Sequence, residues 1–237
     1  MRLINAIVHD IKYQFKHGFY FIYLIMVVFY IVMMGILPEA WKSTATVAVL
    51  FIDPAALGFY FIGSILLLEK GEKVLDALFV SPLRVWEYVL AKAVSLGIIS
   101  VLAGIIIAVI GLGTKVKSPL LILSLLFGSV VYTFVGLSAG VKAKTVNQFM
   151  LITVPAEILL GAPPIILLFG VKSYLLEIMP GSLILRLFQC CTGIIPIGGT
   201  PIDPVLMLVM LIIWSVPVFL LAIKQMNWFV SKIGGTG

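Results

Sequence analysis

The sequence predicts an all-α integral membrane protein of about six transmembrane helices, on three observations. Of its 237 residues, 62% are hydrophobic and only 11% are charged, whereas an average soluble domain carries roughly 25% charged residues. The mean hydropathy is +1.22. Apolar runs near the roughly 20 residues that cross a bilayer recur along the chain. A soluble fold could not cover its surface with so few polar side chains, so a soluble enzyme is excluded.

We expect a single transmembrane domain over residues 1–237 that begins with a helix in the membrane interface. Leu3, Ile7 and Ile11 recur at helical spacing opposite Asp10 and Lys12, which predicts an amphipathic interfacial helix over residues 2–16. The six spans are expected at residues 18–37, 44–68, 89–112, 119–139, 147–170 and 204–223. A cytoplasmic helix is expected at 70–80, and a longer external segment, with several Gly and Pro, at 171–203.

The second span is expected to break or kink at Asp53-Pro54. These two residues make a good N-cap and first-turn pair, but a helix from Pro54 to Leu68 would reach only about 22 Å. The span is therefore expected to start earlier, with Asp53 as an N-cap near the external surface. Asp53 is explained structurally in that position, and a role in shaping the outer gate of a substrate path is the alternative.

Lys and Arg are distributed unequally between the two sides of these spans. The side that holds both termini and residues 69–92 collects eleven of the 16 Lys and Arg residues. The positive-inside rule therefore predicts a multi-pass protein of the cell membrane with both termini in the cytoplasm. The chain has no basic block with interleaved aromatic residues, so we expect the lipid bilayer, and no nucleic acid, as its surroundings.

Residues 69–92 are the most informative stretch for function. A short amphipathic helix is predicted here, because polar residues such as Glu72 and Lys73 lie opposite one apolar face, formed by Val74, Leu75, Leu78 and Phe79. Ser81-Pro82 then supplies an N-cap and a first-turn proline for the next helix. Such a helix can offer its apolar face to a partner protein, or it can rest passively on lipid headgroups. The residues alone leave both open.

The same stretch resembles the signature region of ABC-2 type exporter permeases. The family pattern stands here as Glu69, Gly71, Leu75, Ser81-Pro82, Glu87-Tyr88 and Lys92. The resemblance implies an ABC-2, or type V exporter-like, fold with short re-entrant helices within residues 171–203. It also implies that residues 70–80 are a coupling helix seated in a groove of a cytoplasmic ATPase. The coupling residues would be Glu69, Lys70, Glu72, Val74, Leu75, Leu78, Phe79, Ser81 and Pro82. More narrowly, the chain is similar to permeases for fluoroquinolone export.

The partners and cofactors follow from this resemblance and from a missing motif. No GxxxxGK[ST] phosphate loop occurs in the sequence, so ATP and Mg are expected on a separate ATPase chain and no cofactor or metal on this one. The resemblance implies two copies of the ATPase and a second permease copy, identical or paralogous. No catalytic residue is expected, since His9 and His17 are most simply interfacial polar residues.

Glu157 is the candidate for contact with a transported compound. It lies about ten residues, hence roughly 15 Å, into the fifth span, near the bilayer centre. A carboxylate there must be protonated, partnered or facing water. Glu157 could receive a cationic or hydrogen-bonding substrate, or it could bond a neighbouring helix or the backbone freed by Pro155. Phe59, Tyr60 and Phe61 could line a cavity for an apolar compound, or pack against lipid and neighbouring helices.

The function expected from these observations is the permease subunit of an ATP-driven ABC exporter. It would move a small amphipathic compound, drug-like or lipid-like, out of the cell, along a substrate path with Glu157, Phe59, Phe61 and Asp53. One alternative is an ion-coupled secondary transporter that uses Asp53 and Glu157, although no clear internal repeat is present. Another is a non-transporting immunity or assembly factor that anchors a partner through residues 70–80.

Overall fold

The computed structural model describes residues 2–75, 83–113, 118–171, 173–193 and 203–234. These residues form helices and no strand. Within them, six helical units are long and apolar enough to cross a membrane. The prediction of an all-α integral membrane protein with six spans is therefore confirmed.

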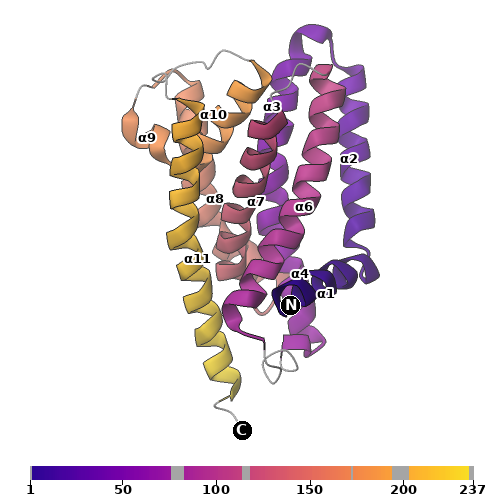
Figure 1. The fold of residues 1–237 in the computed structure, drawn as a ribbon, viewed down its shortest axis with the longest axis vertical. Coiled ribbons are helices and arrows are strands. Elements are labelled where there is room, and N and C mark those ends of the chain that lie inside the picture. Colours follow the sequence, from indigo (N-terminus) through magenta and orange to yellow (C-terminus); the bar gives the residue numbers. More distant parts are fainter. Residues whose placement is uncertain (1, 76–82, 114–117, 172, 194–202, 235–237) are drawn as a thin grey trace.

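The spans follow the chain order expected from hydropathy (Figure 1). The helix expected in the membrane interface is α1 (Arg2–Lys16), and the first span is α2 (Phe19–Ile36). The second span is built from α3 (Glu39–Ala56), the π-helical segment η1 (Leu57–Phe61) and α4 (Ile62–Gly71). The remaining spans are α6 (Val85–Leu112), α7 (Ser118–Gly140), α8 (Val146–Leu168) and α11 (Pro204–Gly234). The segment expected on the external side contains α9 (Tyr174–Ile178) and α10 (Pro180–Thr192).

The second span differs from the expectation at Asp53-Pro54, where the structure has no helix start. Helix α3 runs through both residues to Ala56 and continues through η1 into α4, which gives one helical unit of 33 residues, Glu39–Gly71. Asp53 is fully buried and accepts a hydrogen bond from the Tyr23 hydroxyl at 2.6 Å. The expectation that Asp53 is an N-cap near the external surface is wrong, because α3 runs through this residue and its carboxyl group binds Tyr23 of the neighbouring helix α2.

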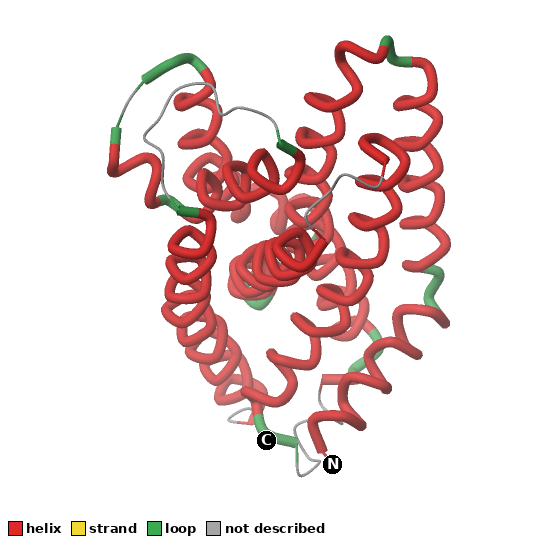
Figure 2. The backbone as a smooth tube through the Cα atoms, turned by 45° about the horizontal axis from the view of Figure 1, so that its top comes forward, coloured by secondary structure: helices red, strands yellow, loops and turns green. Residues whose placement is uncertain are grey.

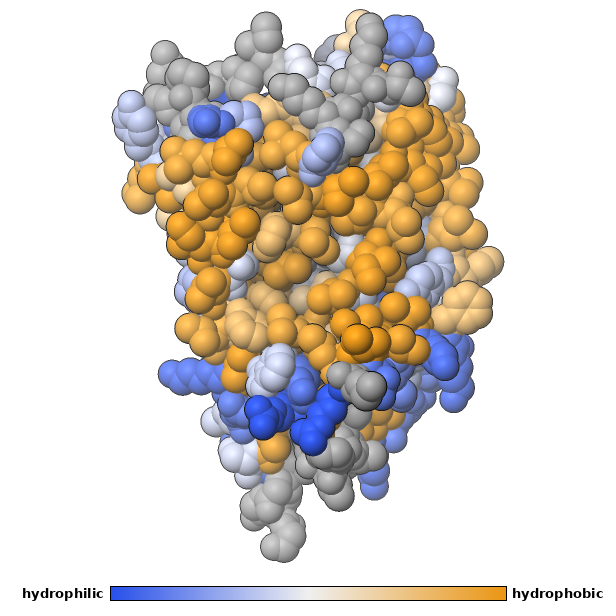
Figure 3. Space-filling view, viewed as in Figure 1, coloured by the Kyte–Doolittle hydropathy of each residue, from blue (hydrophilic) through white to orange (hydrophobic). Residues whose placement is uncertain are grey.

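The bundle is organised around α7, which packs against α6, α11, η1 and α10. Figure 2 shows α1 and the end of α11 at the same end of the molecule. In each of α2 and α11, only 17% of the most apolar 18-residue stretch is buried inside the bundle. The outer faces of both helices are therefore apolar and exposed. On the face shown in Figure 3 the apolar side chains form a broad band across the middle, and blue, hydrophilic residues gather at the end where α1 lies. This distribution fits a bundle whose sides face lipid.

Two glycines allow η1 and α7 to approach each other closely. A Cβ atom added to Gly136 would lie 2.0 Å from the carbonyl oxygen of Gly58. A Cβ atom added to Gly58 would lie 2.2 Å from the Cβ atom of Tyr132. Small residues are the usual means by which helix backbones come into contact inside a membrane. The position of the π-helical segment therefore depends on these two glycines.

We expect Gly136→Ala to destabilise the protein, because the added methyl group would overlap the Gly58 backbone. Overpacking of this kind costs about 1–3 kcal/mol. The measurement is the thermal unfolding midpoint of the purified chain in detergent. Gly35→Ala is the matched control, since nothing lies within 4 Å of a Cβ atom added at Gly35. Equal midpoints for the two variants would contradict the close contact of η1 with α7.

Candidate functional site

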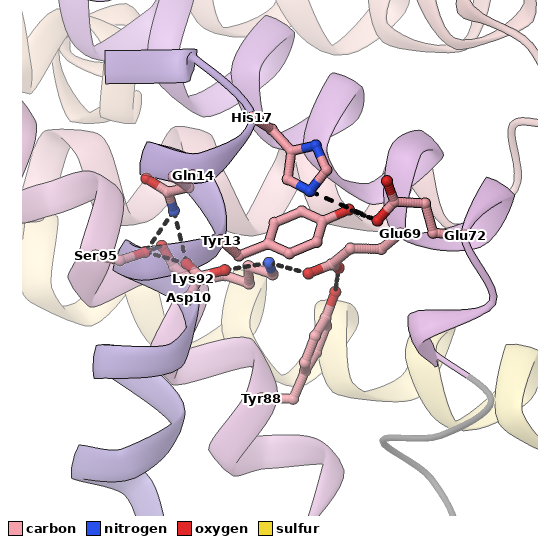
Figure 4. A network of polar contacts seen from close by, with 9 residues as sticks. All are labelled: Asp10, Tyr13, Gln14, His17, Glu69, Glu72, Tyr88, Lys92 and Ser95. Carbon is pink, nitrogen blue, oxygen red and sulfur yellow. Dashed lines mark hydrogen bonds and ion pairs between the residues drawn. The ribbon is translucent and has the colours of Figure 1, made fainter. Parts of the chain in front are cut away.

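A buried ion cluster joins three helices at the end of the bundle where α1 lies. Lys92 of α6 is 1% exposed and forms ion pairs with Asp10 of α1 and Glu69 of α4, the latter at 2.6 Å from Nζ to Oε1. Asp10 and Glu69 are themselves buried. Figure 4 shows the Lys92 ammonium between the two carboxylates. The cluster therefore fixes the interfacial helix, the end of the second span and the start of the third to one another.

The carboxylate oxygens of Asp10 and Glu69 that do not contact Lys92 are also hydrogen-bonded. The Tyr88 hydroxyl donates to Glu69 Oε2 at 2.6 Å. Gln14 donates to Asp10 Oδ2 at 2.7 Å, and the Ser95 hydroxyl donates to the same oxygen. Tyr88, Lys92 and Ser95 follow one another at helical spacing and so share one face of α6. A buried charge is costly unless it is paired and hydrogen-bonded, and this face of α6 provides those partners.

A second set of contacts ties α1 to the chain just after α4. The Tyr13 hydroxyl donates to Glu72 Oε2 at 2.9 Å, and His17 Nε2 lies 3.6 Å from the same oxygen. Burial raises the pKa of Tyr13, and the hydrogen bond to Glu72 and the nearby charge of Glu69 raise it further. The phenol therefore remains protonated at physiological pH and acts as a donor. Glu72, just after α4, is therefore bound to helix α1.

Lys70 attaches the same end of α4 to α7. Its ammonium donates to the carbonyl oxygens of Gly140, Val141 and Ala143, at 2.9, 2.7 and 2.8 Å. It also lies 4.7 Å from the centre of the Phe229 ring of α11. The last carbonyl groups of a helix lack intrahelical partners and carry partial negative charge, so a lysine is a suitable cap there. Lys70 thus acts within this chain as a cap for α7.

The residues expected to contact an ATPase lie in different surroundings. Glu69 is in the ion cluster, Lys70 caps α7, and Glu72 is exposed. Leu75 is 1% exposed and packs, together with the partly buried Val74, against the spans of this chain. The expectation that Leu75 offers its side chain to a partner is corrected, because the bundle already covers it. The other four expected coupling residues lie outside the described residues: Leu78, Phe79, Ser81 and Pro82.

A second site lies between η1 and α8, within the membrane-spanning part. The Tyr60 hydroxyl of η1 donates to Glu157 Oε2 of α8 at 3.3 Å. The other carboxyl oxygen, Oε1, is buried and has no hydrogen-bond partner among the described residues. Both side chains line a hollow of about 190 Å³ whose walls are otherwise largely apolar and aromatic, formed by Phe51, Ile52, Phe59, Tyr132 and Gly161. The site could hold an apolar compound that carries a hydrogen-bond donor or a positive charge.

The structure brings together some of the expected substrate-path residues and separates others. Phe59 lies at the hollow and meets Tyr132 edge to face, with 5.3 Å between the ring centres. Phe61 packs instead against Phe19 and Tyr23 of α2, each at 5.9 Å. Asp53 binds Tyr23 and does not line the hollow. Contact of a transported compound with Glu157 or Phe59 stays a prediction.

Three members of the ion cluster were not expected from the sequence: Asp10, Gln14 and Ser95. Of the cluster, only Lys92 could have been noticed from the sequence, because an ionisable residue inside an apolar span needs a partner of opposite charge. Asp10 was expected on the polar face of the interfacial helix, and Gln14, four residues later, shares that face, but the amphipathic pattern does not show that this face meets α6. In the described part of the chain, no group of three or more His, Cys, Asp and Glu side chains could hold a metal ion.

We expect Lys92→Met to lower the stability of the protein by about 3–5 kcal/mol, because it leaves two buried carboxylates without their cation. The measurement is thermal or denaturant unfolding of the purified chain. Lys144→Met, at an exposed lysine near the same end, should change little. The triple variant Asp10→Asn, Glu69→Gln, Lys92→Met should recover part of the loss, since it leaves no unpaired charge. A single variant as stable as the parent would contradict the role of the cluster.

Comparison with known proteins agrees with this architecture. The model of the fluoroquinolones export permease protein family matches residues 1–231. Two proteins named fluoroquinolones export permease protein, from Mycobacterium tuberculosis strains CDC 1551 / Oshkosh and ATCC 25618 / H37Rv, are each 28% identical to this chain over 166 residues, which is 70% of this chain and 70% of theirs. No solved structure matches the chain. The chain belongs to the fluoroquinolones export permease protein family.

Proposed function

We propose that this chain is the membrane-spanning permease subunit of an ATP-driven ABC exporter. The family supports a membrane permease in an export system. The observation that carries the ATP-driven part is the ion cluster of Lys92, Asp10 and Glu69. It holds together the ends of the two spans, α4 and α6, between which the expected coupling helix lies. A force applied to that segment would therefore act on both spans at once.

In the proposed cycle, a separate cytoplasmic ATPase, present in two copies, binds ATP and Mg. Its closure on nucleotide pushes the segment at residues 70–80. Because Glu69 is bound to Lys92, the push moves α4 and the start of α6 together. Helix α4 continues directly into η1, which carries Tyr60 at the hollow. A displacement of α4 thus reaches the contact between Tyr60 and Glu157 and changes access to the hollow.

The chemistry of the hollow favours a small amphipathic substrate. Aromatic walls suit a flat apolar body, and the Glu157 carboxyl group suits a cationic or hydrogen-bonding group. The relatives are named for fluoroquinolones, which makes an aromatic drug of this kind the first compound to test. A carboxyl group on a lipid-facing surface would be costly, so we propose that a second permease copy covers the hollow and completes the path.

The charge distribution supports a cell-membrane location with both termini in the cytoplasm. Helix α1 and the end of α11 lie at the same end of the bundle (Figure 2). Lys70, in the last turn of α4, lies at this end, and so do Lys142 and Lys144, which follow α7. On the face shown in Figure 3, hydrophilic residues gather at that end. The positive-inside rule assigns such an end to the cytoplasm.

An ion-coupled mechanism would require Asp53 and Glu157 to act along one route. The structure gives them different partners, Tyr23 for Asp53 and Tyr60 for Glu157. Only Glu157 lines the hollow. No contact in the described residues favours this alternative, or a non-transporting anchor, over the exporter.

The ATPase partner is tested by purifying the tagged chain from native membranes and assaying the eluate for vanadate-sensitive ATP hydrolysis. We expect Leu78→Asp to lose the co-purified ATPase while the thermal midpoint of the permease stays unchanged, because the resemblance places Leu78 in the coupling helix. Leu75→Asp is the comparison, and it should lower the thermal midpoint, since Leu75 is buried. If Leu78→Asp retains the ATPase at the parent ratio, the docking proposal fails.

The role of the hollow is tested by Glu157→Gln in cells exposed to a fluoroquinolone. We expect efflux at low drug concentration to fall about tenfold, the effect of losing one hydrogen bond to a charged group. Glu39→Gln is the control, because Glu39 is exposed in the first turn of α3 and pairs with Lys42. Unchanged drug accumulation in Glu157→Gln, at equal amounts of protein in the membrane, would remove Glu157 from the proposed path.

A further inference from the structure

A second hollow, of about 230 Å³, opens beside the ion cluster. The buried side chains of Asp10, Glu69 and Lys92 line it from the bundle side. Asn5 and His9 line it from α1. The proposed export path runs elsewhere, between η1 and α8, so this hollow is not part of that path.

The cluster side of the hollow is suited to a positively charged donor. Among the described residues, Asp10 Oδ1 and Glu69 Oε1 each accept one hydrogen bond, and in both cases the donor is Lys92. A carboxylate oxygen can accept two hydrogen bonds. Two carboxylates share one ammonium, so this triad has acceptor capacity and negative charge left for a second ammonium group.

The α1 side of the hollow is suited to a phosphate. Asn5 and His9 are four residues apart, on one face of the helix, and both side chains carry N–H donors. Arg2, three residues before Asn5, also lines the hollow and adds positive charge. The two sides of the hollow thus differ in chemistry, with donors on one and carboxylates on the other.

The hollow lies at the depth of lipid headgroups. Ile4 and Val8 of α1 are 64% and 44% exposed, although they are apolar, while Asp10 and Gln14 face the bundle. A helix with this distribution lies in the membrane interface with its apolar side toward the acyl chains. Figure 1 shows α1 lying across the end of the bundle and not along it.

We propose that this hollow binds the headgroup of a zwitterionic phospholipid that carries a primary ammonium, as in phosphatidylethanolamine. The ammonium lies against Asp10 and Glu69, and the phosphate lies against Asn5 and His9. A lipid bound in this way contacts α1, α4 and α6 together and strengthens the joint that Lys92 makes between them. The stability of that joint then depends on membrane composition, whichever compound the protein exports.

The test is native mass spectrometry of the purified full-length chain, titrated with phosphatidylethanolamine, phosphatidylcholine and phosphatidylglycerol of identical acyl chains. Phosphatidylcholine has no N–H donors on its cation, and phosphatidylglycerol has no cation. We expect both to bind about tenfold more weakly than phosphatidylethanolamine, the loss for one hydrogen bond to a charged group. Equal binding of phosphatidylethanolamine and phosphatidylcholine would overturn the proposal, and so would tightest binding of phosphatidylglycerol, which would indicate a basic surface only.

Two variants locate the binding at this hollow. Ala6→Phe fills it, because Ala6 lines it from α1, and should abolish the preference for phosphatidylethanolamine. Ile4→Phe adds an aromatic ring to the lipid-facing side of the same helix and should leave the preference intact. Asn5→Leu, at an exposed position, removes a donor without a risk to folding and should weaken phosphatidylethanolamine binding. Retention of the full preference in both Ala6→Phe and Asn5→Leu would overturn the proposal.

Discussion

The Lys92 ammonium is the contact on which the end of the bundle where α1 lies depends. A charge removed from water costs several kcal/mol unless partners compensate it, and Lys92 obtains its partners from two other helices, through Asp10 and Glu69. The amphipathic helix α1 therefore does more than rest on the membrane. Its polar residues Asp10 and Gln14 face the bundle, where Asp10 binds Lys92. Its exposed apolar residues point away from the bundle, where lipid would cover them.

This joint determines how the second span can move. The lower end of the span is fixed by Glu69 and Lys70, through α6 and α7. The middle is held by the hydrogen bond from Tyr23 to Asp53. Between these two attachments lies η1, where the regular hydrogen-bond ladder is interrupted, and such π-helical turns are often found at functional sites. Tyr60 lies within this segment, between the two attachments.

Hydropathy was sufficient to predict the six apolar helices, because each is a property of one continuous stretch. The expected N-cap at Asp53 was wrong, because a local cap signal cannot show that α3 continues through this residue or that Tyr23 of another helix binds its carboxyl group. The face that Phe59, Tyr60 and Phe61 present could not be predicted either, since a π-helical segment departs from the helical period on which such an assignment rests. The partners of Lys92 come from stretches far apart in sequence, which no local pattern relates.

The carboxyl groups of Asp53 and Glu157, both in membrane-spanning helices, differ in whether a ligand can reach them. Each accepts one tyrosine hydroxyl and keeps one oxygen without a partner among the described residues. Asp53 is fully buried, so nothing outside the bundle can reach it. Its 2.6 Å hydrogen bond with Tyr23 joins α2 and α3. Glu157 lines a hollow and accepts a longer bond, 3.3 Å, from the π-helical segment. A ligand can compete for Glu157 at little cost to the fold, whereas displacement of Tyr23 from Asp53 would separate two spans.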